Sequence, residues 1–71
     1  MNIISIGGSD PSSGAGIQSD VKTFSNLDAY GLTVVTTITS QNTRKVTSIE
    51  PVSIKSLNAQ LDSILSDFHI D

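Results

Sequence analysis

The sequence predicts an α/β fold with a parallel sheet that this chain begins but does not complete. Three observations indicate this: predicted segments alternate as strand, helix, strand, helix; a glycine-rich loop joins the first strand to the first helix; and the chain has only 71 residues. A crossover from about residue 7 to residue 31 is typical of a right-handed βαβ unit. Two parallel strands do not form a stable sheet by themselves, so we expect the sheet to continue in residues that this chain lacks.

The first half of the chain predicts one strand and one helix. Residues 2–6 are rich in isoleucine and predict a short strand that ends at Gly7 and Gly8. Residues 7–16 contain four glycines and a proline, which is typical of a loop with tight turns. From about residue 15 to residue 27, apolar residues recur at the spacing of one helix face: Ile17, Val21, Phe24 and Leu27.

The second half predicts another strand and another helix. Residues 32–39 are β-branched apart from Leu32, which favours a strand covered on both faces. Residues 40–45 are polar and loop-like, and residues 46–50 suit a short extended segment. Ser53 suits the N-cap of a helix whose apolar residues recur over four turns: Ile54, Leu57, Leu61, Ile64, Leu65 and Phe68.

Composition excludes several classes of protein. The four basic residues, Lys22, Arg44, Lys45 and Lys55, are scattered among seven acidic ones, so we expect no nucleic-acid partner. The absence of cysteine and the single histidine argue against a disulfide framework and a structural zinc site. No long apolar run and no basic leader segment are present, so we expect no membrane partner and a cytoplasmic location.

The glycine-rich loop does not match the known phosphate-binding patterns. The dinucleotide fingerprint needs a third glycine where Ser19 stands, and the P-loop needs a lysine where Ala15 follows Gly14. Two interpretations remain. The glycines either only allow the turn to close, or they line a ligand site.

The second interpretation follows from the topology. The carboxyl ends of parallel strands border the ligand crevice of α/β proteins, so the loops at residues 7–16 and 39–43 are expected to line one mouth. The Gln41 amide both donates and accepts, which suits the ring nitrogen and exocyclic amine of a heterocycle, although a solvated amide is equally compatible. Asp20 can bind a substrate hydroxyl or amine, or can simply interact with the helix N-terminus.

The run GGSDPSSGAGIQSDVKTF at residues 7–24, followed by Tyr30-Gly31 and Gln41-Asn42-Thr43, closely resembles the N-terminus of hydroxymethylpyrimidine/phosphomethylpyrimidine kinases of thiamine biosynthesis. The likeness covers essentially the whole chain. It implies a ribokinase-like fold several times longer than this chain, with residues 1–71 as the N-terminal, acceptor-binding part of a single kinase domain. It also implies an ATP-dependent transferase that phosphorylates hydroxymethylpyrimidine and its monophosphate.

The resemblance implies which residues bind the substrate. Five of them match positions around the pyrimidine: Gly8, Ala15, Asp20, Thr39 and Gln41. Gln41 is expected to hydrogen-bond the aminopyrimidine edge, while Gly8 and Ala15 permit close approach of the ring. ATP, Mg²⁺, the general base and the anion hole are expected to be served by residues beyond 71, so this chain is expected to contain no catalytic residue and to be inactive alone.

The sequence is also compatible with other functions. A pyridoxal-type kinase of the same fold, a non-catalytic ligand-binding remnant and an unrelated nucleotide-binding domain remain alternatives, and the full-length enzyme can be a homo-oligomer. The chain also departs from the family pattern: Ser13 and Asp28 stand where glycine is usual, and Lys45 replaces the glycine that commonly follows Asn-Thr-x. Aspartate tolerates the left-handed backbone conformation moderately well.

Overall fold

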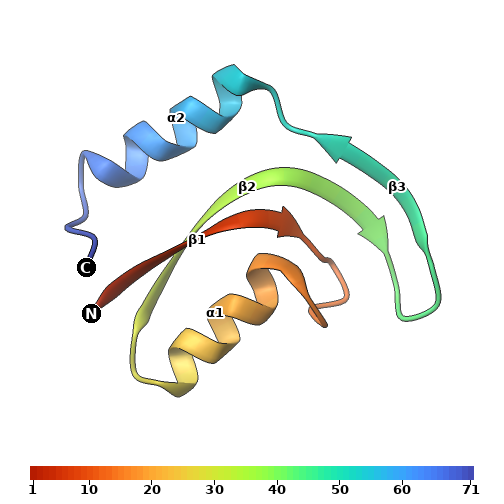
Figure 1. Ribbon diagram of the computed structural model, residues 1–71, viewed down its shortest axis with the longest axis horizontal. Coiled ribbons are helices and arrows are strands. Elements are labelled where there is room, and N and C mark those ends of the chain that lie inside the picture. Colours follow the sequence, from red (N-terminus) through yellow and green to blue (C-terminus); the bar gives the residue numbers. More distant parts are fainter.

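The computed structural model describes residues 1–71 as three strands and two helices. Their order is β1 (Asn2–Ser9), α1 (Gly16–Asn26), β2 (Tyr30–Gln41), β3 (Val46–Pro51) and α2 (Ile54–Leu65). Figure 1 shows α1 on one side of the curved sheet and α2 on the other. The predicted βαβ unit followed by a helix is therefore confirmed. Neither helix has the length and apolarity needed to cross a membrane.

The sheet is mixed, with the strand order β1-β2-β3. β1 and β2 run parallel, and β3 folds back antiparallel on the second half of β2. The prediction that the first strand ends at Gly7 is wrong: β1 continues through both glycines to Ser9. Glycine keeps its backbone N–H and C=O, so Gly7 pairs with Val35 and Gly8 with Thr37, leaving Thr36 as a β-bulge.

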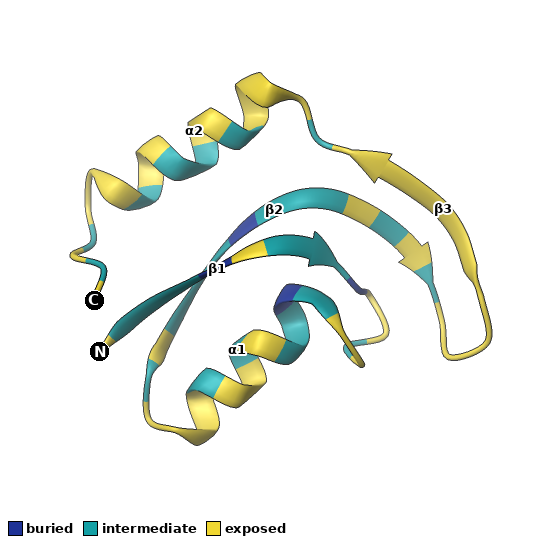
Figure 2. Ribbon diagram, in the orientation of Figure 1, coloured by how far each residue is buried: buried dark blue, intermediate teal, exposed yellow.

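The core of the chain is small and lies between α1 and the two parallel strands. Val34 is completely buried and Ile17 is 6% exposed, at the dark blue positions of β2 and α1 in Figure 2. Several other large apolar side chains are more than half exposed: Ile6, Ile38, Ile49, Ile54 and Leu65. The predicted burial of the second strand on both faces thus holds at Val34 but not at Ile38.

α1 ends in a left-handed turn. Asp28 has φ 58°, its N–H donates to the Ser25 carbonyl at 3.1 Å, and the Ala29 N–H donates to the Phe24 carbonyl at 2.8 Å. This pair of bonds is the Schellman motif, in which glycine usually takes the left-handed position. Asp28 therefore adopts the backbone conformation of the glycine that is usual at this position in the family.

α2 begins as predicted and ends earlier than predicted. The Ser53 hydroxyl oxygen accepts the Ser56 N–H at 3.0 Å, which is an N-cap hydrogen bond. The helix stops at Leu65, so Phe68 lies beyond it rather than on its apolar face. There Phe68 stacks on Tyr30 at the start of β2, with ring centroids 6.0 Å apart.

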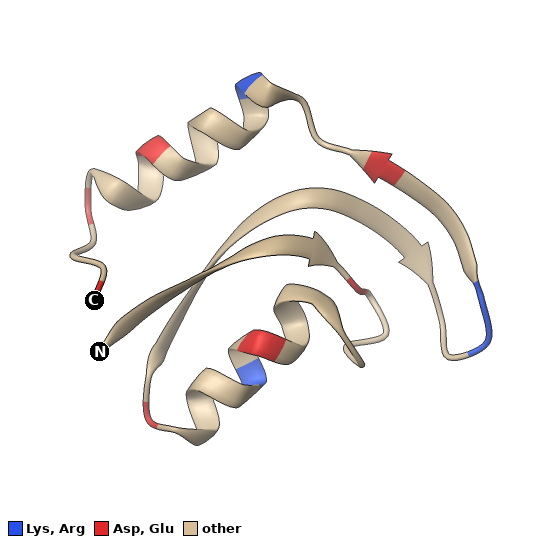
Figure 3. Ribbon diagram, viewed as in Figure 1, with Lys and Arg blue, Asp and Glu red and all other residues tan.

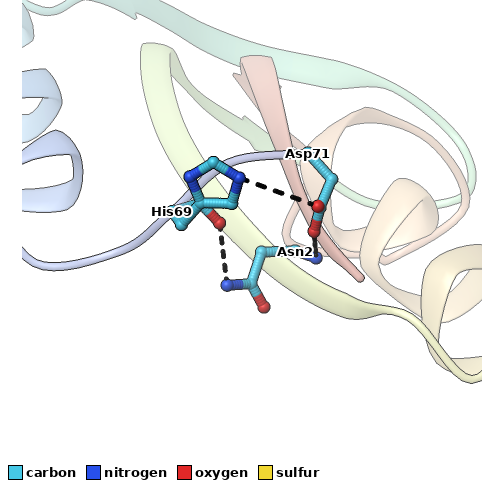
Figure 4. Close-up of polar contacts among 3 residues, drawn as sticks. All are labelled: Asn2, His69 and Asp71. Carbon is cyan, nitrogen blue, oxygen red and sulfur yellow. Dashed lines mark hydrogen bonds and ion pairs between the residues drawn. The ribbon is translucent and has the colours of Figure 1, made fainter.

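The two ends of the chain lie side by side (Figure 1). In Figure 4 the Asn2 N–H donates to the Asp71 carboxylate at 2.7 Å, and the Asn2 side-chain amide donates to the His69 carbonyl at 2.9 Å. The His69 ring approaches the same carboxylate at 4.0 Å but is 90% exposed, so this ion pair contributes little stability.

Candidate functional site

The candidate site lies where β1 and β2 reach their carboxyl ends. Ser9, the last residue of β1, stands opposite Ile38, so the loop after β1 and the last residues of β2 emerge at the same edge of the sheet. This is the edge at which α/β folds bind ligands. The register confirms that residues 7–16 and 39–43 meet at one edge of the sheet, but the cavity that the structure contains does not lie between them.

Asp10 organises the loop that follows β1. Its carboxylate accepts the Ser12 hydroxyl at 2.6 Å, the Ser12 N–H at 2.8 Å and the Ala15 N–H at 2.9 Å, and the residue is 4% exposed. The Ser12 hydroxyl, assisted by the backbone N–H groups and opposed by burial, lowers the pKa of Asp10 below its ordinary value. The ionised Asp10 carboxylate therefore stabilises the loop, because its oxygens accept hydrogen bonds from residues of the loop.

The loop then turns back onto β1 at Gly16. This residue has φ +65°, and a Cβ built on it would lie 2.5 Å from the Gly8 carbonyl oxygen. Only glycine fits such a position. The close approach brings the start of α1, where Ala15 is the N-cap residue, next to Gly8.

Gln18 fixes the end of β1 from the first turn of α1. Its Nε2 donates to the Ser9 hydroxyl at 2.7 Å, and its Oε1 accepts the Asp10 N–H at 2.8 Å. The two halves of one amide thus bind the last residue of β1 and the first residue of the loop. The roles of Gln18 and Ser9 are not predictable from sequence spacing, because their pairing depends on how the loop folds back.

Thr39 and Gln41 extend this network from β2. The Thr39 hydroxyl donates to the Ser9 carbonyl, and the Gln41 Nε2 donates to the Thr39 Oγ1 at 2.7 Å. The second Nε2 proton and the Oε1 of Gln41 make no hydrogen bond within the chain, and Gln41 is half-buried. A donor and an acceptor on the same amide are therefore free at the mouth.

Asp20 lies apart from the other four predicted site residues. Its carboxylate accepts the hydroxyl of the buried Ser5 at 2.7 Å. Ser5 precedes Ser9 by four residues, which is roughly 13 Å along an extended strand. The structure thus places the start of α1, with Ala15, next to Gly8 and links Thr39 to Gln41, but it does not bring Asp20 to Gln41.

The turn after Gln41 closes without a glycine. The Asn42 carboxamide oxygen accepts the N–H groups of Arg44 and Lys45 at 2.9 and 3.2 Å, and the Asn42 N–H donates to the Lys45 carbonyl at 3.1 Å. Lys45 has no left-handed backbone conformation, so its replacement of glycine does not distort the turn. Figure 3 shows this basic pair at the tip of the β2–β3 hairpin.

A cavity of about 310 Å³ lies between α1 and β2, and Gln18 borders both this cavity and the loop network. It is lined by Ile17, Gln18, Val21 and Thr33. None of the predicted site residues lines it. The candidate site is therefore the loop network at the strand ends and not this cavity.

Solved structures define the class of protein. The chain matches the phosphomethylpyrimidine kinase of Clostridium difficile 630 with a TM-score of 0.93 and 41% identity, over 99% of this chain and 32% of that one. It matches the Staphylococcus aureus pyridoxal kinase, solved with AMP-PCP and pyridoxal, with a TM-score of 0.80 and 36% identity, over 92% of this chain and 25% of that one. The chain therefore has part of the ribokinase-like fold of these kinases.

Sequence comparison then identifies the family. The family model described as phosphomethylpyrimidine kinase matches residues 10–71, so the chain belongs to this kinase family. The hydroxymethylpyrimidine/phosphomethylpyrimidine kinase of Escherichia coli (strain K12) is 52% identical over all 71 residues. The match covers 27% of that relative, so the chain spans about a quarter of its length.

Proposed function

We propose that residues 1–71 form the pyrimidine-binding wall of a kinase that transfers the γ-phosphoryl group of ATP to hydroxymethylpyrimidine and then to its monophosphate, in thiamine biosynthesis in the cytoplasm. Family membership supports the reaction. The observation that carries the proposal is the free donor and acceptor of the Gln41 amide at the mouth. An aminopyrimidine presents the complementary pair, since its ring nitrogen accepts and its exocyclic amine donates.

Gly8 supports the same assignment. A Cβ added there would lie 3.8 Å from the Thr37 carbonyl oxygen, which is an ordinary contact, and Gly8 has no left-handed φ. The packing of this chain therefore does not require glycine at position 8, whereas it does at position 16. We assign the space above Gly8, beside Ala15, to the flat face of the pyrimidine ring.

The same proposal limits what the chain does alone. Phosphoryl transfer depends on positioning the acceptor and on electrostatic stabilisation of the transferred group. Gln41, Gly8 and Ala15 position the acceptor, and we assign ATP and Mg²⁺ mainly to residues outside 1–71. The purified 71-residue chain is therefore expected to show no turnover above background in a coupled ATP assay.

Pyridoxal is the second candidate acceptor, because the Staphylococcus aureus relative with the same fold is named a pyridoxal kinase. Its ring also carries a hydroxymethyl group, but it has no exocyclic amine to donate to the Gln41 Oε1. One edge of the pyrimidine therefore serves both free groups of the amide, whereas the ring nitrogen of pyridoxal has no donor group on an adjacent carbon.

A chimera tests the proposal. Residues 1–71 replace the segment of the Escherichia coli relative to which they align over their whole length. The chimera is then assayed for ATP-dependent phosphorylation of hydroxymethylpyrimidine and of pyridoxal at equal concentrations. We expect activity with both the pyrimidine and its monophosphate, and a higher kcat/KM for hydroxymethylpyrimidine than for pyridoxal.

Two controls make the result interpretable. The Escherichia coli relative without its aligned segment measures the background activity, and the intact relative measures full activity. A folded chimera that binds ATP but phosphorylates neither acceptor would refute the proposal. Preference for pyridoxal would replace the pyrimidine with the second candidate.

A further inference from the structure

We infer that Thr39 is a positioning residue that sets the orientation of the Gln41 amide through its hydroxyl group. The inference rests on the proposed function, since it assigns Gln41 to the pyrimidine edge. It differs from the expectation that Thr39 belongs to the wall around the ring: here Thr39 acts through Gln41.

A count of protons carries the inference. A threonine hydroxyl has one proton, and Thr39 donates it to the Ser9 carbonyl. Toward Gln41 the Thr39 Oγ1 can then only accept. The atom that lies 2.7 Å from it must be a donor, so it is the Nε2 of Gln41 and not the Oε1. A reversed amide would set two acceptors against each other with no proton between them.

The Ser9 carbonyl is a fixed reference for this relay. Gln18 binds the Ser9 hydroxyl and the Asp10 N–H, so the peptide that accepts the Thr39 proton is fixed from α1. The same segment carries Gly8, on which we place the ring face. Gly8 and the Gln41 amide are therefore oriented by one connected set of hydrogen bonds.

The orientation matters for recognition. With Nε2 directed to Thr39, Gln41 presents one N–H and the Oε1 in a fixed order. A ring nitrogen beside an exocyclic amine fits that order, and a reversed amide would place oxygen against the ring nitrogen. Without the Thr39 hydroxyl the amide samples both orientations, so part of the binding free energy is spent on selecting one.

The test compares two variants at position 39 in the chimera. Thr39→Val keeps the shape and removes the hydroxyl, while Thr39→Ser keeps the hydroxyl. Loss of one neutral hydrogen bond predicts that Thr39→Val raises the KM for hydroxymethylpyrimidine by about 3- to 10-fold. We expect kcat to stay unchanged and Thr39→Ser to restore the KM. Thr33→Val is the matched control, because Thr33 lies in the first half of β2, opposite Ser5, and its hydroxyl makes no hydrogen bond.

A second readout does not depend on activity. In the ¹⁵N-labelled 71-residue chain without ligand, the Nε2 proton of Gln41 that is bonded to the Thr39 Oγ1 is expected to be shifted downfield and to exchange slowly with solvent. In the Thr39→Val variant the shift and the exchange rate of this proton are expected to become those of a free primary amide, and in Thr39→Ser they are expected to be retained. Circular dichroism of each variant verifies that the fold is unchanged.

The outcomes separate the two proposals. If the chimera shows no pyrimidine kinase activity, the proposed function fails, and the Gln41 signals still decide whether Thr39 orients the amide. If the chimera is active and Thr39→Val leaves both the KM and the Gln41 signals unchanged, the positioning role of Thr39 is overturned.

Discussion

The side-chain amide of Gln60 pairs with the backbone of Val35 as a neighbouring strand would. The Val35 N–H donates to the Gln60 Oε1 at 2.8 Å, and the Gln60 Nε2 donates to the Val35 carbonyl at 2.9 Å. β3 pairs only with Thr37–Gln41, so the first half of this side of β2 has no strand partner. Gln60 thus binds the edge of β2 just before the bulge, and it attaches α2 to the sheet.

Replacement of Gln60 by methionine tests that attachment. Gln60→Met keeps the length of the side chain and removes both hydrogen bonds, so we expect the free energy of unfolding to fall by about 1–3 kcal/mol. Urea unfolding of the 71-residue chain followed by circular dichroism measures the change. Asn58→Leu, at an exposed position of α2 with no side-chain hydrogen bond, is the control. Equal midpoints for Gln60→Met and the wild type would show that the pairing contributes nothing.

The left-handed residues predict stabilising substitutions. Asp28 and Ser13 have φ values of 58° and 67°, where a Cβ is unfavourable. Asp28→Gly is expected to raise the free energy of unfolding by about 0.5–1 kcal/mol, and Ser13→Gly by a similar amount. The thermal midpoint then rises by roughly 2–8 °C for a chain of this size. Asp28→Ala is expected to lower it, and a gain of stability in that variant would contradict the assignment.

Asp10 predicts a dependence of stability on pH. Its pKa is lower in the folded chain than in the unfolded chain, so its contribution is fully present above the unfolded value near 3.8 and is lost as the pH falls through the folded value. We expect Asp10→Asn to be less stable than the wild type at pH 7 and to lose less stability on acidification. Urea midpoints between pH 7 and pH 2 measure this. The exposed Asp67→Asn serves as the control, and parallel pH profiles for wild type and Asp10→Asn would contradict the role of the carboxylate.

Substitutions of Gly16 and Gly8 are expected to affect stability and substrate binding, respectively. Gly16→Ala places a Cβ 2.5 Å from the Gly8 carbonyl oxygen at a left-handed φ, so we expect a loss of about 2 kcal/mol or more. Gly8→Ala meets only ordinary contacts, so stability is expected to stay within about 0.5 kcal/mol while the KM of the chimera for hydroxymethylpyrimidine rises. Thermal melts and KM values check both. A normal KM in the Gly8→Ala chimera would show that the pyrimidine ring does not lie against Gly8.

Much of the fold could be predicted from the sequence. The 3.6-residue spacing of Ile17, Val21 and Phe24 marks α1, and the β-branched run marks β2. The ends were less predictable. Glycine often ends a strand, but Gly7 and Gly8 remain paired with β2. The apolar spacing that includes Phe68 continues past Leu65, where α2 ends. Both differences reflect tertiary contacts that local pattern does not contain.

The candidate site was predictable in outline and not in its connections. Motif and topology indicated that the glycine loop meets the end of β2, and the register of Ser9 with Ile38 agrees. The links through Gln18 and Thr39 depend on a bulge and on the way the loop folds back at Gly16, which sequence spacing does not encode. The same geometry separates Asp20 from Gln41, because the carboxylate binds Ser5 in the middle of β1.

The most direct test of the central claim is the KM for hydroxymethylpyrimidine of the chimera with and without the Gln41 amide, at saturating ATP. Gln41→Leu removes one donor and one acceptor from the ring edge, so we predict a rise in KM of about 10- to 100-fold with the KM for ATP unchanged. An unchanged KM for the pyrimidine in a folded, active Gln41→Leu chimera would contradict the claim that this chain forms the pyrimidine-binding wall.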